Sequence, residues 1–281
     1  MTRRQDLEHH RRSLGEIRDI MNSMKTLAYM ETRKLARFAD AQRAVVDNIE
    51  AVAADFVSFH ADKLPEAGET AAVYLLIGTE RGFCGDFNQI LVRELESTLK
   101  SQAADNPMLI ATGRKLCTLL EDDKRVAARI DGASVVEEVP AVLAEIVREL
   151  SAMQAQRGML TVYSLYHRDG DGIVMRKLLP PFHHHLHQPQ HHPHPPVLNL
   201  RPARFLLELT EHYLFAVLHA MLYASLMAEN HKRVAHLEGA VRKLDDESAE
   251  LARRTSALRR EEIIEEIEVI LLSASSLEAP P

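Results

Sequence analysis

The apolar residues of the first 60 positions recur with a heptad spacing. With Leu7 as position a, thirteen of the sixteen a and d positions between Leu7 and Phe59 are apolar. A repeat of this kind predicts one long helix that packs against a partner helix as a coiled coil. Pro65 and Gly68 predict where this helix ends.

A second long helix is predicted over about 204–273, an interval without proline. Apolar side chains recur there every seven residues. They are Leu237, Leu244, Leu251 and Leu258, with Val234 and Val241 in the companion register. Further on, the predicted seam moves to Ile263, Ile264, Ile267, Ile270 and Leu271. We expect the two terminal helices to pair antiparallel, because each carries a seam that nothing else in the sequence would cover.

The middle of the chain follows a different pattern, in which short apolar runs that end in turn residues alternate with stretches of helical period. Strands are expected at 73–78, 108–113, 159–167 and 173–179, the last two as an antiparallel pair or two late strands. Helices are expected at 88–99, 114–120 and 139–156. Alternation of this kind predicts an α/β domain with a partly parallel, Rossmann-like sheet.

The predicted fold class is therefore mixed α+β. A long antiparallel coiled coil of the N- and C-terminal helices carries an inserted α/β domain. The predicted segments are the first helix over 1–62, the α/β domain over 70–180, a His/Pro-rich loop over 181–200 and the second helix over 201–275.

Composition narrows the class of protein. The chain has 281 residues, 46% of them hydrophobic, with no tryptophan and a net charge of −7, so composition gives no support to a nucleic-acid-binding role. Two cysteines, Cys84 and Cys117, are too few for a disulfide framework, and without an apolar leader at the N-terminus we expect a reducing, cytosolic setting. The apolar run 213–228 is shorter than the roughly 20 residues of a membrane span and is expected to be a buried helix.

The segment 78–88, GTERGFCGDFN, stands between a strand and a helix, where phosphate-binding loops occur. It has neither a Lys-Ser/Thr pair nor the GxGxxG spacing. The favoured interpretation is a tight turn at Gly82 and Gly85, with Asp86 or Asn88 capping the next helix. No catalytic signature occurs, so no catalytic, cofactor-binding or metal residues are assigned and no cofactor is expected.

The segment 182–196 holds seven histidines and four prolines in fifteen residues. Histidines could bind Zn, Ni or Cu, but no Cys, Asp or Glu lies among them to complete a defined site. A surface loop is the favoured interpretation, and a metal site is the alternative.

Three of these regions, in this order, resemble the gamma subunit of F-type ATP synthases. That family carries T-D-R-G-L-C-G-G-x-N after its first strand, and the matching residues here are Thr79, Arg81, Gly82, Cys84, Gly85 and Asn88. Matches in the first helix are Leu7, Ser13, Leu14, Ile20 and Met24. Matches in the last helix are Glu229, Arg233, Val234, Leu237, Arg259, Ile263, Glu266, Ile267 and Ile270.

The chain also departs from the family pattern. The differing residues are Asp19, Asn22, Arg242, Lys243, Arg260 and Ile264. These departures suggest a divergent branch, such as the rotor of an alternative ATPase set.

The resemblance implies a non-catalytic rotor subunit, the central stalk, that turns inside a hexamer of alpha and beta subunits. It implies partnership with the epsilon subunit and the membrane c-ring, and a peripheral position on the cytoplasmic face of the membrane. Residues carried over as contacts with the hexamer are Met24, Lys25, Arg259, Arg260 and Glu266. Each has a plainer explanation: Met24 falls in the predicted seam, and the charged residues could simply face solvent.

Two other functions stay open from the sequence. The heptads alone would suffice for a free-standing coiled-coil scaffold or adaptor. An enzyme could use the α/β domain to bind a nucleotide. Neither the coupled ion, H⁺ or Na⁺, nor the direction of operation can be derived from these residues.

Overall fold

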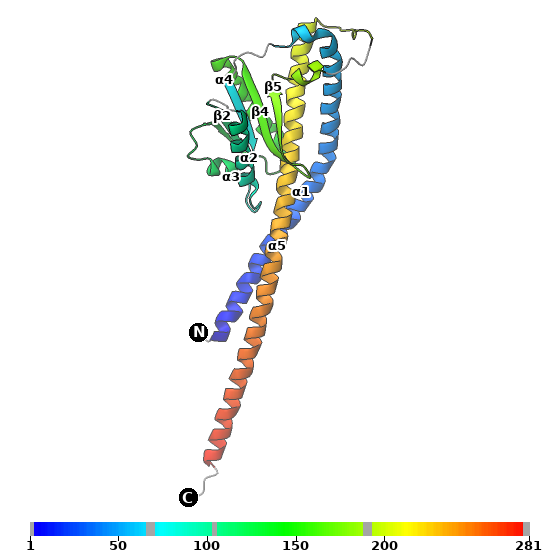
Figure 1. Cartoon of the computed structure of the whole chain (residues 1–281). Helices are drawn as coiled ribbons and strands as arrows, with labels where there is room; N and C mark the ends of the chain where they lie inside the picture. The colour runs from blue at the N-terminus through cyan, green and yellow to red at the C-terminus, as the bar shows by residue number, and fades with distance from the viewer. Residues whose placement is uncertain (1–2, 66–70, 103–105, 188–192, 278–281) are drawn as a thin grey trace. The chain divides into compact units, whose positions relative to one another are not determined.

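The computed structural model describes residues 3–65, 71–102, 106–187 and 193–277. Its long helices are α1 (Arg3–His60) and α5 (Pro202–Leu277) (Figure 1). Contacts between residues divide the chain into two compact units, which are described separately. The helical unit contains residues 1–27 and 234–281, and the sheet unit contains residues 28–233. The four predicted segments remain a prediction.

The sheet unit is built on five strands in the order β3-β2-β1-β4-β5. They are β1 (Ala71–Ile77), β2 (Met108–Thr112), β3 (Val126–Ile130), β4 (Leu160–Arg168) and β5 (Gly172–Leu179). β1 pairs in parallel with both β2 and β4, β2 pairs in parallel with β3, and β5 pairs antiparallel with β4. The partly parallel sheet and the late antiparallel pair are confirmed, whereas the edge strand β3 was missed.

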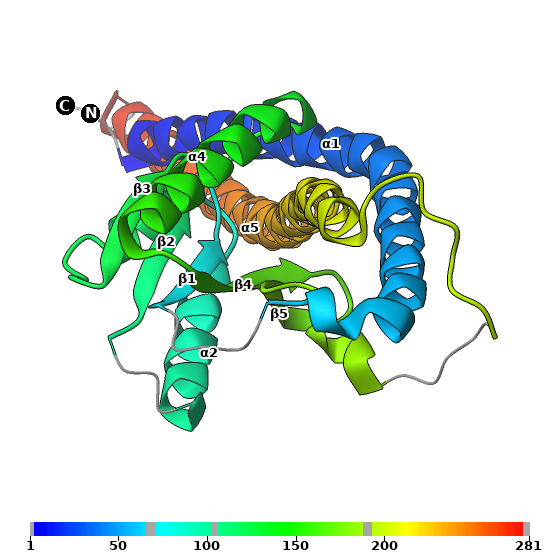
Figure 2. The ribbon, with the colours of Figure 1, turned by 90° about the horizontal axis from the view of Figure 1, so that it is seen from above.

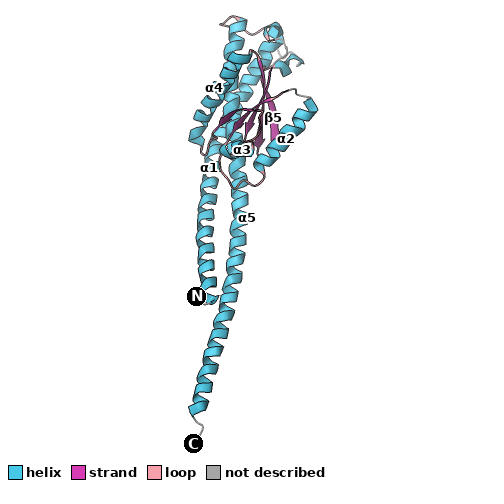
Figure 3. Cartoon of the chain, turned by 90° about the vertical axis from the view of Figure 1, so that its left-hand side faces the viewer, coloured by secondary structure: helices cyan, strands magenta, loops and turns pink. Residues whose placement is uncertain are grey.

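Helices cover both faces of this sheet (Figures 2 and 3). On one face, α2 (Phe87–Gln102) and α3 (Arg114–Leu119) pack on Tyr74 and Leu76. On the other face, α4 (Val139–Arg157) and parts of α1 and α5 pack on Val73, Leu75 and Ile77. Because successive residues of a strand point to opposite faces, the uninterrupted apolar run of β1 fits a central strand buried on both sides.

Short 3-10 helices lie in the connections of the sheet unit, and Gly158 ends α4. The 3-10 helices are η1 (Ala61–Lys63), η2 (Val136–Glu138) and η3 (His183–His187). α4 ends at Gly158, whose φ of 81° is in the left-handed region and whose N–H donates to the carbonyl of Gln154 at 2.9 Å. A glycine at this position closes the helix without steric strain and lets the chain enter β4 directly.

The apolar run 213–228 forms a core segment of α5, as expected. By length and composition α5 could cross a membrane, and half of its most apolar window is buried. Tyr213, Val217 and Met221 expose almost no surface and belong to the core cluster beneath the sheet. His219 is also buried, and its Nδ1 lies 3.1 Å from the carbonyl of Phe215 one turn earlier.

Antiparallel pairing of α1 and α5 is confirmed within each unit. In the helical unit, Arg18 pairs with Asp245 at 2.6 Å and Arg4 with Glu262 at 2.9 Å. In the sheet unit, the ring of Phe38 lies 6.0 Å from that of Tyr223, and the ring of Phe56 lies 5.1 Å from that of Phe205. As residue numbers rise along α1, those of its partners on α5 fall by nearly the same amount.

The seam of α1 differs from the predicted register at its d positions. The a positions are buried or half-buried throughout, among them Leu14, Leu35 and Phe56. Five predicted d positions are exposed instead: His10, Ile17, Phe38, Val45 and Val52. The buried companions lie four residues after an a position, at Thr32, Val46 and Ala53. The Thr32 hydroxyl is satisfied by donating to the carbonyl of Tyr29 at 2.7 Å.

The seam of α5 is confirmed in its first part and wrong in its last part. Leu237, Val241 and Leu251 are buried, and the residues between them in the same register are half-buried. The predicted continuation is exposed, at Ile263, Ile264, Ile267, Ile270 and Leu271. At 100° per residue, these side chains occupy a different face of the helix from the seam. α1 also begins at Arg3, close to the level of Glu262, so α5 runs on beyond the start of its partner.

Candidate functional site

The loop that follows β1 is fastened to α5 by a buried ion pair. The carboxylate of Glu229 accepts hydrogen bonds from the backbone N–H groups of Glu80 and Arg81, each at 3.4 Å. The Arg233 guanidinium pairs with this carboxylate and donates to the carbonyl of Gly82 at 3.2 Å. Glu229 is 3% exposed and Arg233 is 5% exposed. Both residues belong to the helix motif that carried the family resemblance, so the two motifs meet in space.

Burying the charges of Glu229 and Arg233 has an electrostatic cost. Burial raises the pKa of the Glu229 carboxyl, and the Arg233 guanidinium and the two backbone N–H groups act in the opposite direction. A buried charge that loses its partner is strongly destabilising. The pair therefore holds the loop on α5 through both of its charged groups.

Within the loop, the motif residues bind one another. Asn88 accepts from the backbone N–H of Thr79 at 3.0 Å and donates to its hydroxyl at 2.9 Å. Of the two predicted caps, Asn88 is wrong, because its side chain is occupied by Thr79, whereas Asp86 directly precedes α2, which begins at Phe87. Gly85 takes a φ of 61°, as the turn interpretation requires, whereas Phe83 and not Gly82 supplies the other left-handed position, with a φ of 65°.

Cys84 is a buried thiol. Its Sγ lies 3.4 Å from the carbonyl of Gly82 and 3.8 Å from that of Glu229. Burial raises its pKa to about 12. Cys117 is half-buried, and burial raises its pKa as well.

We expect Cys84 to react slowly with iodoacetamide in the folded protein. At pH 8 a thiol with a pKa near 12 has roughly 1000-fold less thiolate than an ordinary cysteine, and the thiolate is the nucleophile. Alkylation of a Cys117→Ser variant, followed by mass spectrometry with and without denaturant, isolates Cys84. Equal rates in the two conditions would show that the loop does not bury the thiol.

A second carboxylate, Glu80, ties together three strand ends of the parallel sheet. It accepts from the backbone N–H groups of Gly132 at 2.7 Å and Arg114 at 2.9 Å, and the Arg114 guanidinium lies 3.1 Å from its other oxygen. In open α/β sheets, ligands bind beyond these carboxyl ends, where free backbone N–H groups hold phosphates. Here the carboxylate of Glu80 accepts from the backbone N–H groups that would otherwise be free to bind a phosphate.

The hollow beside Glu80 is also unsuited to a nucleotide. It has a volume of about 640 Å³ and is lined by four carboxylates and two guanidinium groups. These belong to Glu80, Asp131, Glu138, Glu145, Arg114 and Arg129. The excess of negative charge disfavours phosphates, so this site does not support the nucleotide-binding enzyme.

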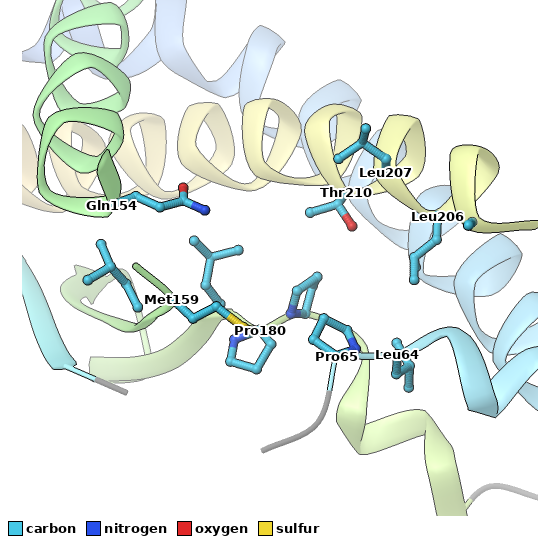
Figure 4. Close-up of a pocket in the computed structure, with 12 residues that line it drawn as sticks. Leu64, Pro65, Gln154, Met159, Pro180, Leu206, Leu207 and Thr210 are labelled. Atoms are coloured by element: carbon cyan, nitrogen blue, oxygen red, sulfur yellow. The ribbon is translucent and has the colours of Figure 1, made fainter. Parts of the chain in front are cut away.

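A smaller cavity of about 290 Å³ lies where the end of β5 meets the start of α5 (Figure 4). Leu64, Met159, Pro180 and Leu206 form part of its wall. None of its twelve lining residues is charged, and its polar side chains are those of Gln154 and Thr210. Such a cavity favours apolar contacts over a phosphorylated ligand.

The residues predicted to contact the hexamer lie in the helical unit as two separate groups. Met24 and Lys25 are half-buried on α1, and Arg259, Arg260 and Glu266 are exposed on α5. The pairing of Arg18 with Asp245 places Met24 opposite about residue 239 of α5. Some 20 residues of helix, about 30 Å, therefore separate the two groups.

Glu80 was missed by the sequence analysis, although it lies inside the recognised loop. Its role depends on Arg114 and Gly132, which are 34 and 52 residues away along the chain. A glutamate three residues after the end of a central parallel strand was the available signal.

Comparison with known proteins places this architecture in a family. The family model ATP-synt, described as ATP synthase, matches residues 3–277. The ATP synthase gamma chains of Clostridium botulinum strains 657 and Loch Maree are each 21% identical over 273 residues, covering 94% of this chain and 95% of theirs.

Two solved structures share the fold. The central stalk and c-ring structure of the Tetrahymena thermophila mitochondrial ATP synthase contains a chain that matches with a TM-score of 0.57 at 17% identity, over 79% of this chain and 99% of that one. The rotor of the Euglena gracilis mitochondrial ATP synthase contains one that matches with a TM-score of 0.58 at 13% identity, over 92% and 98%. Because the family model spans nearly the whole chain, the protein belongs to the ATP synthase family, as a member of its gamma chains.

Proposed function

We propose that the protein is the central-stalk rotor subunit of an F-type ATP synthase, which couples ion flow across a membrane to ATP synthesis or hydrolysis. Its family membership carries this proposal. The helical unit supports it, because two antiparallel helices with a leucine-rich seam make a stiff rod. Its partners are the alpha and beta subunits, which form the catalytic hexamer, the epsilon subunit and the c-ring.

The proposed mechanism is mechanical, and this chain is non-catalytic. Near its end, α5 carries exposed isoleucines on one side and glutamates on the other. The isoleucines include Ile263 and Ile267, and the glutamates include Glu261, Glu265 and Glu268. A rotating helix with two unlike sides presents a different surface to each surrounding subunit in turn. The chemistry of ATP then takes place in the hexamer.

The α/β region is proposed to bind the c-ring, which places the protein peripherally on the cytoplasmic face of the membrane. Its carboxylates support a structural task for this region. Glu80 and Glu229 fasten the loop after β1 to neighbouring elements, where a nucleotide-binding protein would keep backbone N–H groups free. A fixed loop suits a domain that transmits torque.

We expect the tagged chain, expressed in its own cells, to co-purify with alpha and beta subunits as one complex that hydrolyses ATP. Size-exclusion chromatography with mass spectrometry of the eluted fraction measures this. A free-standing scaffold predicts instead a homo-oligomer without those subunits. Tight binding of ATP to the isolated chain, measured by calorimetry, would favour the enzyme over the rotor.

A further inference from the structure

Three side chains that are far apart in sequence converge in the sheet unit. Glu50 lies on α1, and His184 and His185 lie on η3, which follows β5. Nε2 of His185 is 2.6 Å from Oε2 of Glu50, and Nε2 of His184 is 3.1 Å from the same oxygen. Two imidazole nitrogens thus face a single carboxylate oxygen, although 134 residues separate Glu50 from His184.

The other oxygen of this carboxylate is held by an arginine. Nη2 of Arg176, on β5, lies 2.6 Å from Oε1 of Glu50. The Arg176 guanidinium also lies over the ring of Tyr213, with its Cζ 5.7 Å from the ring centroid. Arg176 therefore orients Glu50 so that Oε2 faces the two histidines. Carboxylates that bind metals are commonly held in this way by a second partner.

We propose that Glu50, His184 and His185 form a binding site for a divalent transition-metal ion, with Zn²⁺ as the best match. One ligand atom from each residue lies within 4.8 Å of the other two. Two histidines and a carboxylate, with a fourth position open to water, are a common zinc ligand set. Imidazole ligands favour Zn, Ni or Cu over Mg or Ca.

The distances are close to those that a metal ion requires. With bonds of about 2.0–2.1 Å in tetrahedral geometry, ligand atoms lie about 3.3 Å apart. The separation of His184 from Glu50 is already near this value, and that of His185 from Glu50 has to lengthen by less than about 1 Å.

One side of the proposed metal site is buried, and the other side is open to solvent. The side chain of His185 is 7% exposed, whereas that of His184 is 57% exposed, so an ion and a water ligand can enter from solvent. His183, the preceding residue, lies within hydrogen-bond distance of the carbonyls of Pro65 and Pro181, at 2.9 Å and 3.1 Å. These contacts hold the start of η3 in place.

A surface loop was the favoured interpretation of the histidine-rich run, because no acidic residue lies within it. The structure supplies that residue from α1. A bound ion would link α1 to the segment between β5 and α5. This inference does not depend on the rotor function. Two other histidines of the run offer an internal comparison, because His191 and His192 are not among the three proposed ligands.

Titration of the full chain with ZnCl₂ by isothermal calorimetry tests the site. We expect one ion per chain with micromolar or tighter affinity, and a Tm that rises with the concentration of free zinc. His184→Ala is the first variant, because an exposed side chain can be removed without unfolding the protein. We expect it to weaken binding at least about tenfold, and Glu50→Gln to do the same.

The matched control is the double variant His191→Ala/His192→Ala, which removes two histidines of the same run and is expected to bind zinc like the wild type. Melting curves without metal establish that each variant is folded. Absence of binding by the wild type at millimolar zinc would overturn the proposal. So would loss of binding in the control with full binding in His184→Ala and Glu50→Gln, because the ion would then be held by the flanking run.

Discussion

Replacing Arg233 with alanine is expected to lower the free energy of unfolding by about 3–5 kcal/mol, because it leaves the buried carboxylate of Glu229 without its partner. The change also removes the hydrogen bond from Arg233 to the carbonyl of Gly82. The Tm should fall by about 10 °C for a chain of this size, as measured by circular dichroism during heating. The loop after β1 should become susceptible to proteolysis at a lower temperature than the rest of the chain.

Arg254→Ala is the matched control for this prediction. Arg254 pairs with Glu250 at the same i,i+4 spacing, but both side chains are more than half exposed. An exposed pair contributes less than about 1 kcal/mol, so this variant should melt close to the wild type. Equal Tm values for the two variants would show that the Glu229–Arg233 pair does not hold the loop on α5.

The sequence predicted the elements well where local periodicity determines them. The two long helices, three parallel strands and the late antiparallel pair all follow from spacings within a few residues. β3 was missed because its five residues, VAARI, include the charged Arg129 and are too short to show a pattern. The d register of α1 failed because the buried companions fall four residues after an a position and not three. Val46 and Ala53 are buried there, whereas the equally apolar Val45 and Val52 face solvent.

The carboxylates that organise the sheet unit could not be predicted in the same way. Glu50, Glu80 and Glu229 each act on groups between 34 and 149 residues away. In a sequence, a glutamate on a helix is indistinguishable from a solvated one until the partner elements are placed. Glu229 carried a signal from the family resemblance, and Glu80 carried one only in its place shortly after a central parallel strand.

The exposed end of α5 is the feature most relevant to the rotor function. Taking Arg259 as the reference, Ile263 and Ile267 lie about 40° and 80° around the helix, and Glu266 lies about 20° to the other side. Arg259 and Glu266 therefore share a face with isoleucines that are 46% and 50% exposed. Isoleucines with this exposure, flanked by charged residues, are typical of a surface that another protein covers. Glu261 and Glu268 lie about 200° from Arg259 and Glu266, on the opposite side.

The double variant Arg259→Ala/Glu266→Ala is expected to impair coupling in the assembled complex. If these side chains contact the hexamer as proposed, their loss should weaken the binding of the hexamer to α5 by an order of magnitude or more. The ratio of ion pumping to ATP hydrolysis in reconstituted vesicles should then fall, while the Tm of the isolated chain stays within about 1 °C of the wild type, since both side chains are exposed.

Glu261→Ala/Glu268→Ala, on the opposite side, removes two charges and should leave the ratio unchanged. Unchanged coupling in the first variant would exclude Arg259 and Glu266 as contacts, and equal loss in both variants would show that the effect is not specific to the side of α5 that carries these two residues.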